Sequence, residues 1–370
     1  MAYGVGKLQQ IPLTLQASIE STRVEYRKLG RSGLRVSNPI LGGLQFGSSQ
    51  WLPWVMDEEK ATHLLKQAYD YGINTWDTAN TYSNGESERI MGRALRKHKI
   101  PRRKVVLMSK CYRVVSDPEH YEVGSSMAFM HEHAAQSKDY VNNWGLSRNA
   151  IFASVEASLE RLNTTYLDVL QIHRYDETVE PEETMRALHD LVVMGKVRYL
   201  GASSMWTYQF AKLQHTAEKR GWTKFVAMQN HYNLLYREEE REMIKYCNET
   251  GVGLIPWAPL ASGQLARPYQ QNGKSLRSAL TKNGGIYHDD DDLRSEAIIM
   301  RVEEVANKRG WPMSHVALAW LYRRVTAAVI GFSSHSQLND IVAARGKLLT
   351  ADEERYLEEA YRPRFVQGHS

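Results

Sequence analysis

The stretch GINTWDTANTYSNGESE occupies residues 72–88, and its pattern repeats in outline along the chain. Its apolar first part ends at Asp77 and is typical of a short buried strand. A Ser-Asn-Gly turn follows and leads into a segment with helical spacing. Tyr82 lies in this turn, five residues after Asp77. In parallel sheets, side chains that follow the end of a strand in this way are often functional.

Two further apolar runs also end in one polar residue. VVLMSK ends at Lys110, and LDVLQIH ends at His173. With Asp77 and Tyr82 they supply an ammonium, an imidazole, a carboxylate and a phenol, which in one cleft can pass a proton to a carbonyl oxygen. A phenol alone is a weak acid, with an unperturbed pKa of about 10, and a buried ammonium beside it favours the phenolate. These four residues are the candidate catalytic group.

Each of the four has an ordinary explanation when taken singly. Asp77 could cap the following helix, Tyr82 could pack against the core, Lys110 could point to solvent, and His173 could be a structural histidine. The combination is what favours chemistry, because all four ordinary explanations would have to hold at once.

Strand-like runs alternate with helical periodicity after a short hairpin over 24–38, which has Gly30 and Gly33 in its turn. The expected strands are residues 39–44, 73–77, 105–109, 167–172, 197–201, 225–229, 252–256 and 327–331. Eight strands that are each followed by a helix predict an α/β fold, a (β/α)8 TIM barrel. No G-x-G-x-x-G follows a strand, which disfavours an open dinucleotide-binding sheet. We expect residues 1–23 to form a flexible arm and residues 24–370 a single barrel domain.

The expected strands share polar or special residues at their carboxyl ends, namely Asp77, Lys110, His173, Ser203, Gln229, Trp257 and Gly331. In a barrel these ends meet on one face, where active sites lie. Two long loops, 111–149 after the third strand and 261–292 after the seventh, are interpreted as lids over that face.

Composition narrows the function classes. The 370 residues are 42% hydrophobic and 24% charged, with a net charge of +5 that is scattered along the chain, so nucleic-acid binding is not expected. No apolar stretch is long enough to span a membrane, and no secretory signal precedes the hairpin. Two cysteines, Cys111 and Cys247, suit a reducing compartment, so a cytoplasmic location is expected. The HEH at 131–133 and the HDDDD at 288–292 lack the spacing of a metal site, and we expect no metal.

From about Glu25 to Leu349 the chain resembles the aldo-keto reductases, and among them the fungal reductases of the versiconal hemiacetal acetate reductase and norsolorinic acid reductase type. The matching segments are LGRSGLRVS, GINTWDTANTYSNGESERIMGRAL, VVLMSK, YLDVLQIHR, GKVRYLGASS, MQNHYNLLYR, PWAPLASGQL and VIGFSSHSQLND. The resemblance implies NAD(P)H-dependent reduction of a carbonyl group, with Tyr82 as general acid. Lys110 and Asp77 would then assist Tyr82, and His173 would orient the carbonyl.

The resemblance also implies where a nicotinamide cofactor would bind. Ser203, Ser204 and Gln229 match the positions that hold the carboxamide, and Trp257 matches the aromatic residue that stacks on the nicotinamide ring. The other matching positions are Leu260, Gly263, Arg267 and Arg277 near the pyrophosphate, and Ser333 and Gln337 near the adenosine. NADPH is the expected cofactor, with NADH as the alternative.

Aromatic residues are frequent in the loops that would surround the barrel mouth, and they predict a bulky, aromatic or prenylated carbonyl substrate. They are Phe46, Trp51, Trp54, Tyr112, Trp144 and Tyr175. Anchoring of the lid is the alternative explanation for several of them. Two other functions remain open: a cofactor-binding regulatory subunit, since potassium-channel beta subunits share the scaffold, and an alcohol dehydrogenase that works mainly in the oxidative direction.

Overall fold

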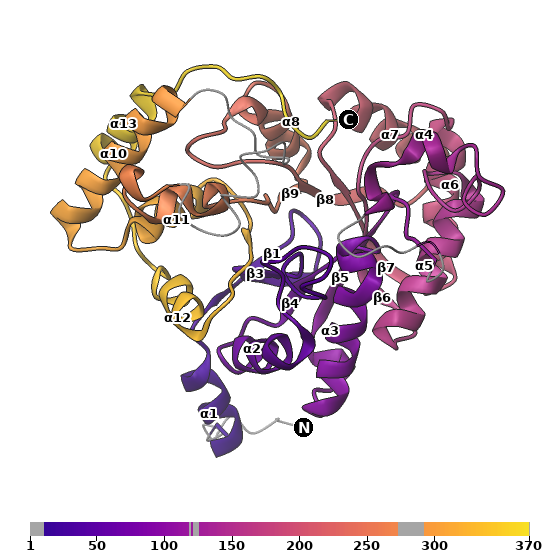
Figure 1. Cartoon of the computed structure of the whole chain (residues 1–370), viewed down its shortest axis with the longest axis horizontal. Coiled ribbons are helices and arrows are strands. Elements are labelled where there is room, and N and C mark those ends of the chain that lie inside the picture. The colour runs from indigo at the N-terminus through magenta and orange to yellow at the C-terminus, as the bar shows by residue number, and fades with distance from the viewer. Residues whose placement is uncertain (1–10, 118–119, 121–125, 273–291, 370) are drawn as a thin grey trace, which may run out of the picture.

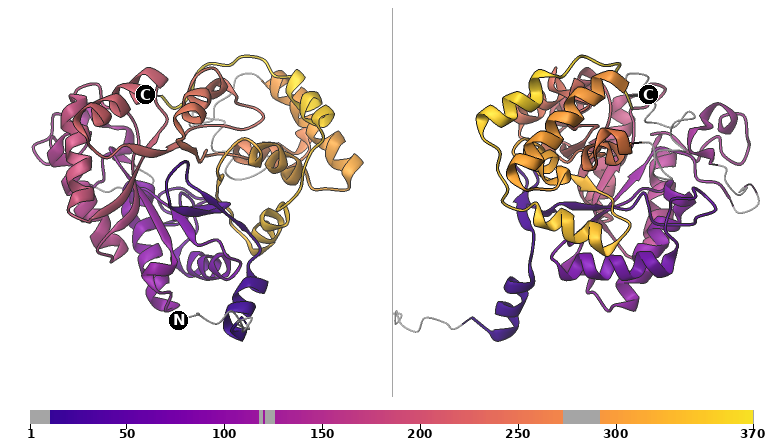
Figure 2. Two further views of the ribbon diagram at one scale, coloured as in Figure 1. Left: turned by 180° about the vertical axis from the view of Figure 1, so that it is seen from behind. Right: turned by 60° about the vertical axis from the view of Figure 1, so that its left-hand side comes forward.

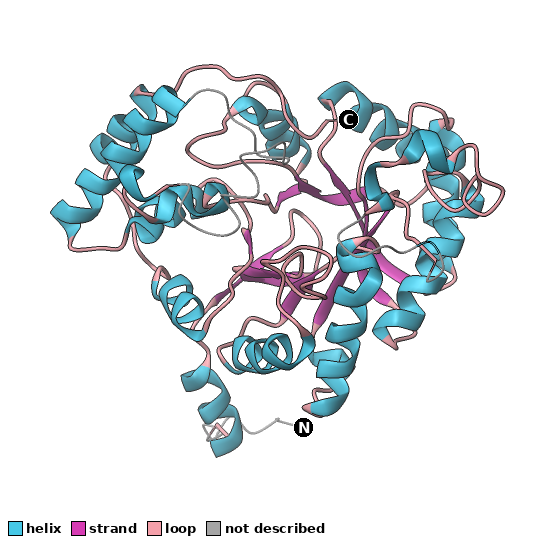
Figure 3. Ribbon diagram, viewed as in Figure 1, coloured by secondary structure: helices cyan, strands magenta, loops and turns pink. Residues whose placement is uncertain are grey.

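Eight parallel strands lie at the centre of the computed structural model, and helices surround them (Figure 1 and Figure 3). The structure describes residues 11–117, 120, 126–272 and 292–369. The strands of the sheet are β3 Ile40–Gly42, β4 Thr75–Asp77, β5 Val106–Cys111, β6 Leu167–Ile172, β7 Val197–Ser203, β8 Phe225–Gln229, β9 Gly253–Leu254 and β10 Val329–Ile330. They are ordered β10-β3-β4-β5-β6-β7-β8-β9, so each strand lies beside its neighbour in the chain.

Backbone hydrogen bonds join the two ends of this sheet. The Val329 N–H donates to the Pro256 carbonyl at 2.9 Å, and the Thr326 N–H donates to the Leu254 carbonyl at 2.9 Å. The sheet therefore closes on itself, and the predicted (β/α)8 barrel is confirmed. All eight expected strands are present, and 167–172 and 225–229 have the expected bounds. The first, second, seventh and eighth are shorter than expected, while the third and fifth extend farther, to Cys111 and Ser203.

The helices that follow the strands cover the outside of the barrel (Figure 1). They are α2 Glu58–Asp70, α3 Glu86–Lys97, α5 Arg148–Leu162, α6 Pro181–Val193, α7 Thr207–Arg220, α8 Met243–Thr250, α10 Asp292–Arg309, α11 Met313–Tyr322 and α12 His335–Ala343, with α13 Ala351–Glu359 after the last strand's helix. Their apolar faces pack on the outward side chains of the strands, such as Leu107, Leu170 and Leu200. This layer between sheet and helices forms the larger part of the core.

The predicted hairpin closes the amino-terminal end of the barrel. It consists of β1 Glu25–Lys28 paired with β2 Arg35–Asn38. Leu29 and Val36 are fully buried, and they pack in one cluster with the inward side chains of the strands, including Val106, Met108 and Val169. The apolar interior is thus sealed at one end, and a ligand can approach only from the other.

A helix lies within the segment expected to be a flexible arm. It is α1 Leu13–Ser21, and none of its residues is buried. It protrudes from the barrel on the side opposite to the segment around α4 His131–Ala134, as the right-hand view of Figure 2 shows. Its apolar residues Leu13, Leu15 and Ile19 are exposed. Their spacing does not place them on one face of a helix, so the sequence shows no amphipathic pattern here.

The two expected lids are described in part. The first contains a short 3-10 turn, Met127–Phe129, and the short helix α4. The second contains 3-10 turns at Ala261–Ala266 and Tyr269–Gln271, and residues 273–291 lie outside the described residues. Most of the HDDDD run falls in that gap, and α10 begins at its last residue, Asp292. Within the described ranges, none of the helices is both long and apolar enough to cross a membrane.

Leu29→Ala should lower the free energy of unfolding by about 2–5 kcal/mol, because it removes a fully buried side chain that seals the barrel. Leu348→Ala is the matched control, since Leu348 is 65% exposed and should change stability by less than about 0.5 kcal/mol. Urea unfolding followed by circular dichroism measures both. Equal effects of the two substitutions would contradict the role given to the hairpin.

Candidate active site

A buried ion pair between Asp77 and Lys110 lies at the carboxyl ends of β4 and β5. The Lys110 Nζ is 2.5 Å from Asp77 Oδ2, and the two side chains are 0% and 2% exposed. Lys110 Nζ also donates to the Thr78 carbonyl at 2.9 Å. A buried pair of this kind is stable only when its remaining hydrogen-bonding capacity is satisfied.

The second oxygen of Asp77 is satisfied by two amides, one from β6 and one from β8 across the barrel. Gln171 Nε2 donates to Asp77 Oδ1 at 2.7 Å, and Gln229 Nε2 donates to the same oxygen at 3.1 Å. Gln229 Nε2 also lies 3.2 Å from Gln171 Oε1. Sequence reasoning missed Gln171, although its place two residues before His173 puts both on the inward face of β6.

Lys110 is held in its charged form. Burial alone would lower its pKa, but the Asp77 carboxylate and Tyr82 more than offset that effect, and the pKa of Lys110 is raised above its ordinary value. The ammonium therefore persists across the neutral range and beyond.

Tyr82 lies beside this ammonium. Its hydroxyl is 3.4 Å from Lys110 Nζ, which is 5.0 Å from the centre of the ring. The turn that presents Tyr82 continues through Ser83, Asn84 and Gly85, with φ values of 49°, 52° and 85°. Left-handed backbone is tolerated best by glycine and asparagine, which explains the Asn84-Gly85 pair at this point.

His173 completes the group that the sequence predicted. Its ring is 6.0 Å from the ring of Tyr82, centre to centre, in an edge-on arrangement. Burial, and then the positive charges of Arg174, Arg113 and Lys110, lower the pKa of His173 well below its ordinary value. The imidazole is therefore neutral near pH 7 and can donate one hydrogen bond without carrying a charge.

A second group of predicted residues is linked by hydrogen bonds at the ends of β7 and β8. Ser203 Oγ donates to the Gln229 carbonyl at 2.8 Å, and the Ser204 N–H donates to the same carbonyl at 3.2 Å. Trp257 Nε1 donates to Ser204 Oγ at 3.0 Å. His231 stacks on the ring of Trp257 at 4.2 Å, so the indole is held from two sides.

The loop from Leu260 to Arg267 has the features of an anion-binding turn. Ser262 and Gly263 adopt left-handed conformations, and Arg267 Nε donates to the Gly263 carbonyl at 3.1 Å. The hydroxyl of Ser262 is buried and has no hydrogen-bond partner among the described residues. An orphaned hydroxyl beside a left-handed turn and a guanidinium fits a phosphate group. Arg277, the other predicted residue here, lies outside the described residues.

The two positions expected at the adenosine end lie at the start of α12. The Ser333 N–H and hydroxyl donate to Gln337 Oε1 at 2.7 and 3.1 Å. Ser334 caps the helix by accepting from the Gln337 N–H at 3.2 Å. Ser333 and Gln337 therefore already bind each other and would have to share these groups with any ligand.

The predicted aromatic residues divide into two sets. Phe46 is fully buried and Trp51 is 8% exposed, so in this structure Phe46 has no face open to a ligand. The half-buried members are Trp54, Tyr112, Trp144 and Tyr175. Tyr112 meets Trp144 edge-on at 6.4 Å, and His131 lies within 5.3 Å of both rings, centre to centre.

A family comparison fits this arrangement. The model of the aldo/keto reductase family matches residues 40–362. The chain belongs to the aldo/keto reductase family.

Relatives of this aldo/keto reductase align over nearly their whole length. The aldo-keto reductase dtxS3 of Metarhizium robertsii is 65% identical over 364 residues, which cover 98% of each chain. A putative aryl-alcohol dehydrogenase of Schizosaccharomyces pombe, C977.14c, is 47% identical and covers 93% of this chain and 97% of its own. Versiconal hemiacetal acetate reductase of Aspergillus parasiticus is 46% identical, with 93% of this chain and 98% of its own covered. The expected family membership is confirmed.

The carboxyl-terminal tail of this reductase lies against the same site, which sequence reasoning missed. It runs from α13 past α8 toward α7 (Figure 1). Gly368 adopts a φ of 79°, and a Cβ there would lie 3.3 Å from the Trp257 ring. His369 pairs with Glu239 at 2.7 Å and meets the Trp206 ring edge-on at 4.7 Å. No local pattern in the sequence indicates these contacts, since they join positions more than 100 residues apart.

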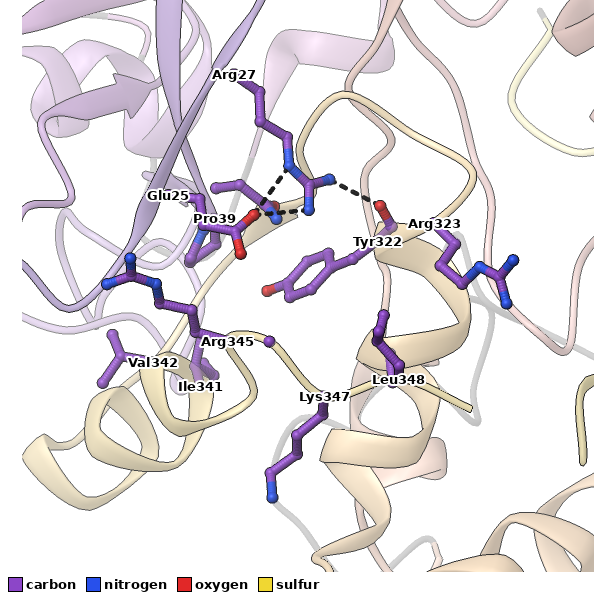
Figure 4. Close-up of a pocket in the computed structure, with 13 residues that line it drawn as sticks. Glu25, Arg27, Pro39, Tyr322, Arg323, Ile341, Val342, Arg345, Lys347 and Leu348 are labelled. Atoms are coloured by element: carbon purple, nitrogen blue, oxygen red, sulfur yellow. Dashed lines mark hydrogen bonds and ion pairs between the residues drawn. The ribbon is translucent and has the colours of Figure 1, made fainter. Parts of the chain in front are cut away.

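A pocket at the other end of the reductase contains none of the predicted site residues (Figure 4). It lies between the hairpin and α11 and is lined by Arg27, Tyr322 and Arg345, among others. Arg27 is bonded to Glu25 and to the Tyr322 carbonyl, and Arg345 to the Thr22 carbonyl, so these cations already have partners. Across the described part of the chain, no three His, Cys, Asp or Glu side chains are grouped as metal ligands.

Lys110→Met should lower the free energy of unfolding by about 3–5 kcal/mol, because it leaves the Asp77 carboxylate buried without its cation. The double variant Lys110→Met/Asp77→Asn should recover a large part of that loss, since asparagine is neutral and keeps an oxygen for Gln171 and Gln229. Urea unfolding of Lys110→Met, Asp77→Asn and the double variant measures the difference. A double variant as unstable as the sum of the two single variants would show that charge is not the cause.

Proposed function

We propose that this protein reduces an aldehyde or ketone to the alcohol with NADPH, and that Tyr82 is the general acid. The observation that carries the proposal is the contact of 3.4 Å between the Tyr82 hydroxyl and the buried ammonium of Lys110. Both groups lie at the carboxyl end of the barrel, where enzymes of this architecture place their chemistry.

Tyr82 donates its proton to the carbonyl oxygen as the carbon is reduced. The phenolate left behind is stabilised by Lys110, and Asp77 keeps Lys110 charged and fixed in direction. An opposite charge at about 4 Å is worth about 4 kcal/mol at an effective dielectric constant of about 20. General acid catalysis contributes about 100- to 10,000-fold, or about 3–5 kcal/mol, so one ammonium is enough to account for it.

His173 orients the substrate in this proposal. A neutral imidazole donates a hydrogen bond to the carbonyl oxygen and does not compete with Tyr82 as the proton donor. Its position is fixed by the backbone, since the His173 N–H donates to the Cys111 carbonyl at 2.9 Å. The lowered pKa of His173 keeps it in this neutral form at physiological pH.

The cofactor supplies hydride to the carbonyl carbon when it is bound. Ser203, Ser204 and Gln229 offer the hydroxyl and amide groups that a carboxamide needs, and Trp257 offers a ring face for the nicotinamide. The loop that carries Leu260, Gly263 and Arg267 would hold the pyrophosphate. Arg277 is assigned to the same phosphates, and Ser333 and Gln337 to the adenosine. NADPH is preferred over NADH, and rates with the two cofactors test that preference.

A bulky aromatic carbonyl compound is the proposed substrate class. Tyr112, Trp144 and the half-buried rings of Trp54 and Tyr175 offer an apolar wall. The name of one relative, a putative aryl-alcohol dehydrogenase, points to an aromatic substrate. The same name also favours the reverse reaction, oxidation of an aromatic alcohol, which would use the same residues. A place in fungal secondary metabolism follows as part of this proposal.

Tyr82→Phe should lower kcat for reduction of benzaldehyde by about 100- to 10,000-fold, because it removes the proton donor and leaves the ring. The dissociation constant of NADPH, measured by fluorescence titration, should change less than about threefold. Tyr246→Phe is the control, because Tyr246 lies on α8 and packs on Phe210 away from the site, and it should keep the parental rate. A Tyr82→Phe enzyme with the parental rate would rule out Tyr82 as the acid.

Trp257→Ala should raise the dissociation constant of NADPH about 3- to 10-fold, since it removes the ring face and its bond to Ser204. Trp311→Ala, which removes a half-buried indole elsewhere, should leave the constant unchanged. Fluorescence titration of the cofactor gives both values. An unchanged constant for Trp257→Ala would contradict the stacking role.

A further inference from the structure

Arg113 is a buried cation at the barrel mouth that the proposed chemistry does not use. The residue is 6% exposed. Its Nη1 donates to the Ala128 carbonyl at 3.2 Å, and its Cζ lies 4.2 Å from the centre of the Phe129 ring. No carboxylate of the described residues pairs with it. A guanidinium has five N–H donors, and within the described residues the hydrogen bond to Ala128 uses one of them.

Burying a charge without a counter-ion is unfavourable. Burial lowers the pKa of Arg113, and only the tyrosines Tyr112 and Tyr82 act in the opposite direction. Neither a backbone carbonyl nor a ring face compensates a guanidinium as a carboxylate does. The structure therefore keeps a positive charge here at a cost in stability, which indicates that an anion completes the site.

The segment that carries Arg113 is bound to the turn that presents Tyr82. Asn80 Nδ2 donates to the Arg113 carbonyl at 3.1 Å, and Asn84 Nδ2 donates to the Ser116 carbonyl at 2.9 Å. The Ser116 N–H returns a bond of 2.7 Å to Asn84 Oδ1. These bonds are on both sides of Tyr82, so Arg113 has a fixed place relative to the proposed acid.

The backbone before Arg113 is strained. Tyr112 has a φ of 134°, which a bulky residue rarely adopts and which costs about 1–3 kcal/mol. The Gly145 N–H donates to the Tyr112 carbonyl at 2.7 Å and holds this conformation. The strained residue lies between Lys110 and Arg113 and turns the chain at the end of β5. Backbone strain of this kind is common at active sites, where it fixes the direction of a functional side chain.

We propose that Arg113 binds a carboxylate of the substrate, and that the substrate is an oxo acid whose carboxylate lies next to the reacting carbonyl. This inference rests on the proposed carbonyl reduction. A guanidinium binds a carboxylate through two parallel hydrogen bonds, which would fix the carbonyl in register with Tyr82 and His173. The apolar part of the substrate then lies against Tyr112 and Trp144.

The position of the carboxylate follows from the neighbours of Arg113. Arg113 comes three residues after Lys110, and its carbonyl accepts from Asn80 Nδ2, two residues before Tyr82. In this proposal an anion bound to Arg113 lies beside the carbonyl oxygen that Tyr82 would protonate, as in a 2-oxo acid. A carboxylate across a benzene ring from the carbonyl would be too far away.

The test compares four substrates with the full-length enzyme and NADPH: phenylglyoxylate, its methyl ester, 4-formylbenzoate and benzaldehyde. For the wild type we expect kcat/KM to be at least tenfold higher for phenylglyoxylate than for its ester. Arg113→Gln should lower kcat/KM for phenylglyoxylate about 10- to 200-fold, mainly through KM. The other three substrates should change less than about threefold, and Arg113→Lys should restore part of the lost activity.

Arg23→Gln is the matched control, because Arg23 also stacks on an aromatic ring, at 3.9 Å from the centre of Tyr71, but precedes the hairpin at the opposite end of the barrel. An equal loss with all four substrates would show that Arg113 only anchors the lid, and the proposal would be wrong. No preference of the wild type for the acid over its ester would also overturn it, even if Arg113→Gln does not fold. A wild type that reduces none of the four with either cofactor would instead contradict the proposed function.

Discussion

The buried pair of Asp77 and Lys110 is the interaction on which the rest of the site depends. A carboxylate and an ammonium inside a barrel are stable only if their other hydrogen-bonding positions are filled. Gln171 and Gln229 fill those of Asp77, and Tyr82 contacts Lys110. Since Gln229 and Asp77 belong to strands that are not neighbours in the sheet, their contact crosses the barrel interior. Only a closed barrel can make it, so closure of the sheet is a condition for the site.

The barrel interior is divided into two parts with different physical roles. Toward the hairpin it is apolar, with Leu29 and Val36 sealing side chains such as Val169. Toward the carboxyl ends of the strands it is polar and contains the charged pair and its amides. Burial of apolar surface stabilises the fold at one end, which allows the other end to keep charges that are costly to bury.

Positive charge at the barrel mouth has several consequences at once. Lys110, Arg113 and Arg174 lower the pKa of His173 together with burial, so the imidazole stays neutral. The same potential would attract an anionic cofactor and, if Arg113 binds a carboxylate, an anionic substrate. Tyr82, the proposed acid, contacts one of these cations, Lys110. In the two proposals, Lys110 stabilises the phenolate of Tyr82, and the nearby Arg113 binds the carboxylate of the substrate.

The sequence by itself determined the barrel, its hairpin and the four residues of the predicted catalytic group. Strand length, apolar character and the polar residue at each strand end are local features, and Asp77 and Lys110 could be read directly from them. The tertiary structure alone decided the partners of Gln171, the complete burial of Phe46, the lack of a carboxylate beside Arg113 among the described residues, and the contact of Gly368 with Trp257. These depend on residues far apart in the chain, such as the 94 positions between Gln171 and Asp77, and no local pattern encodes which side chains meet once the barrel has closed.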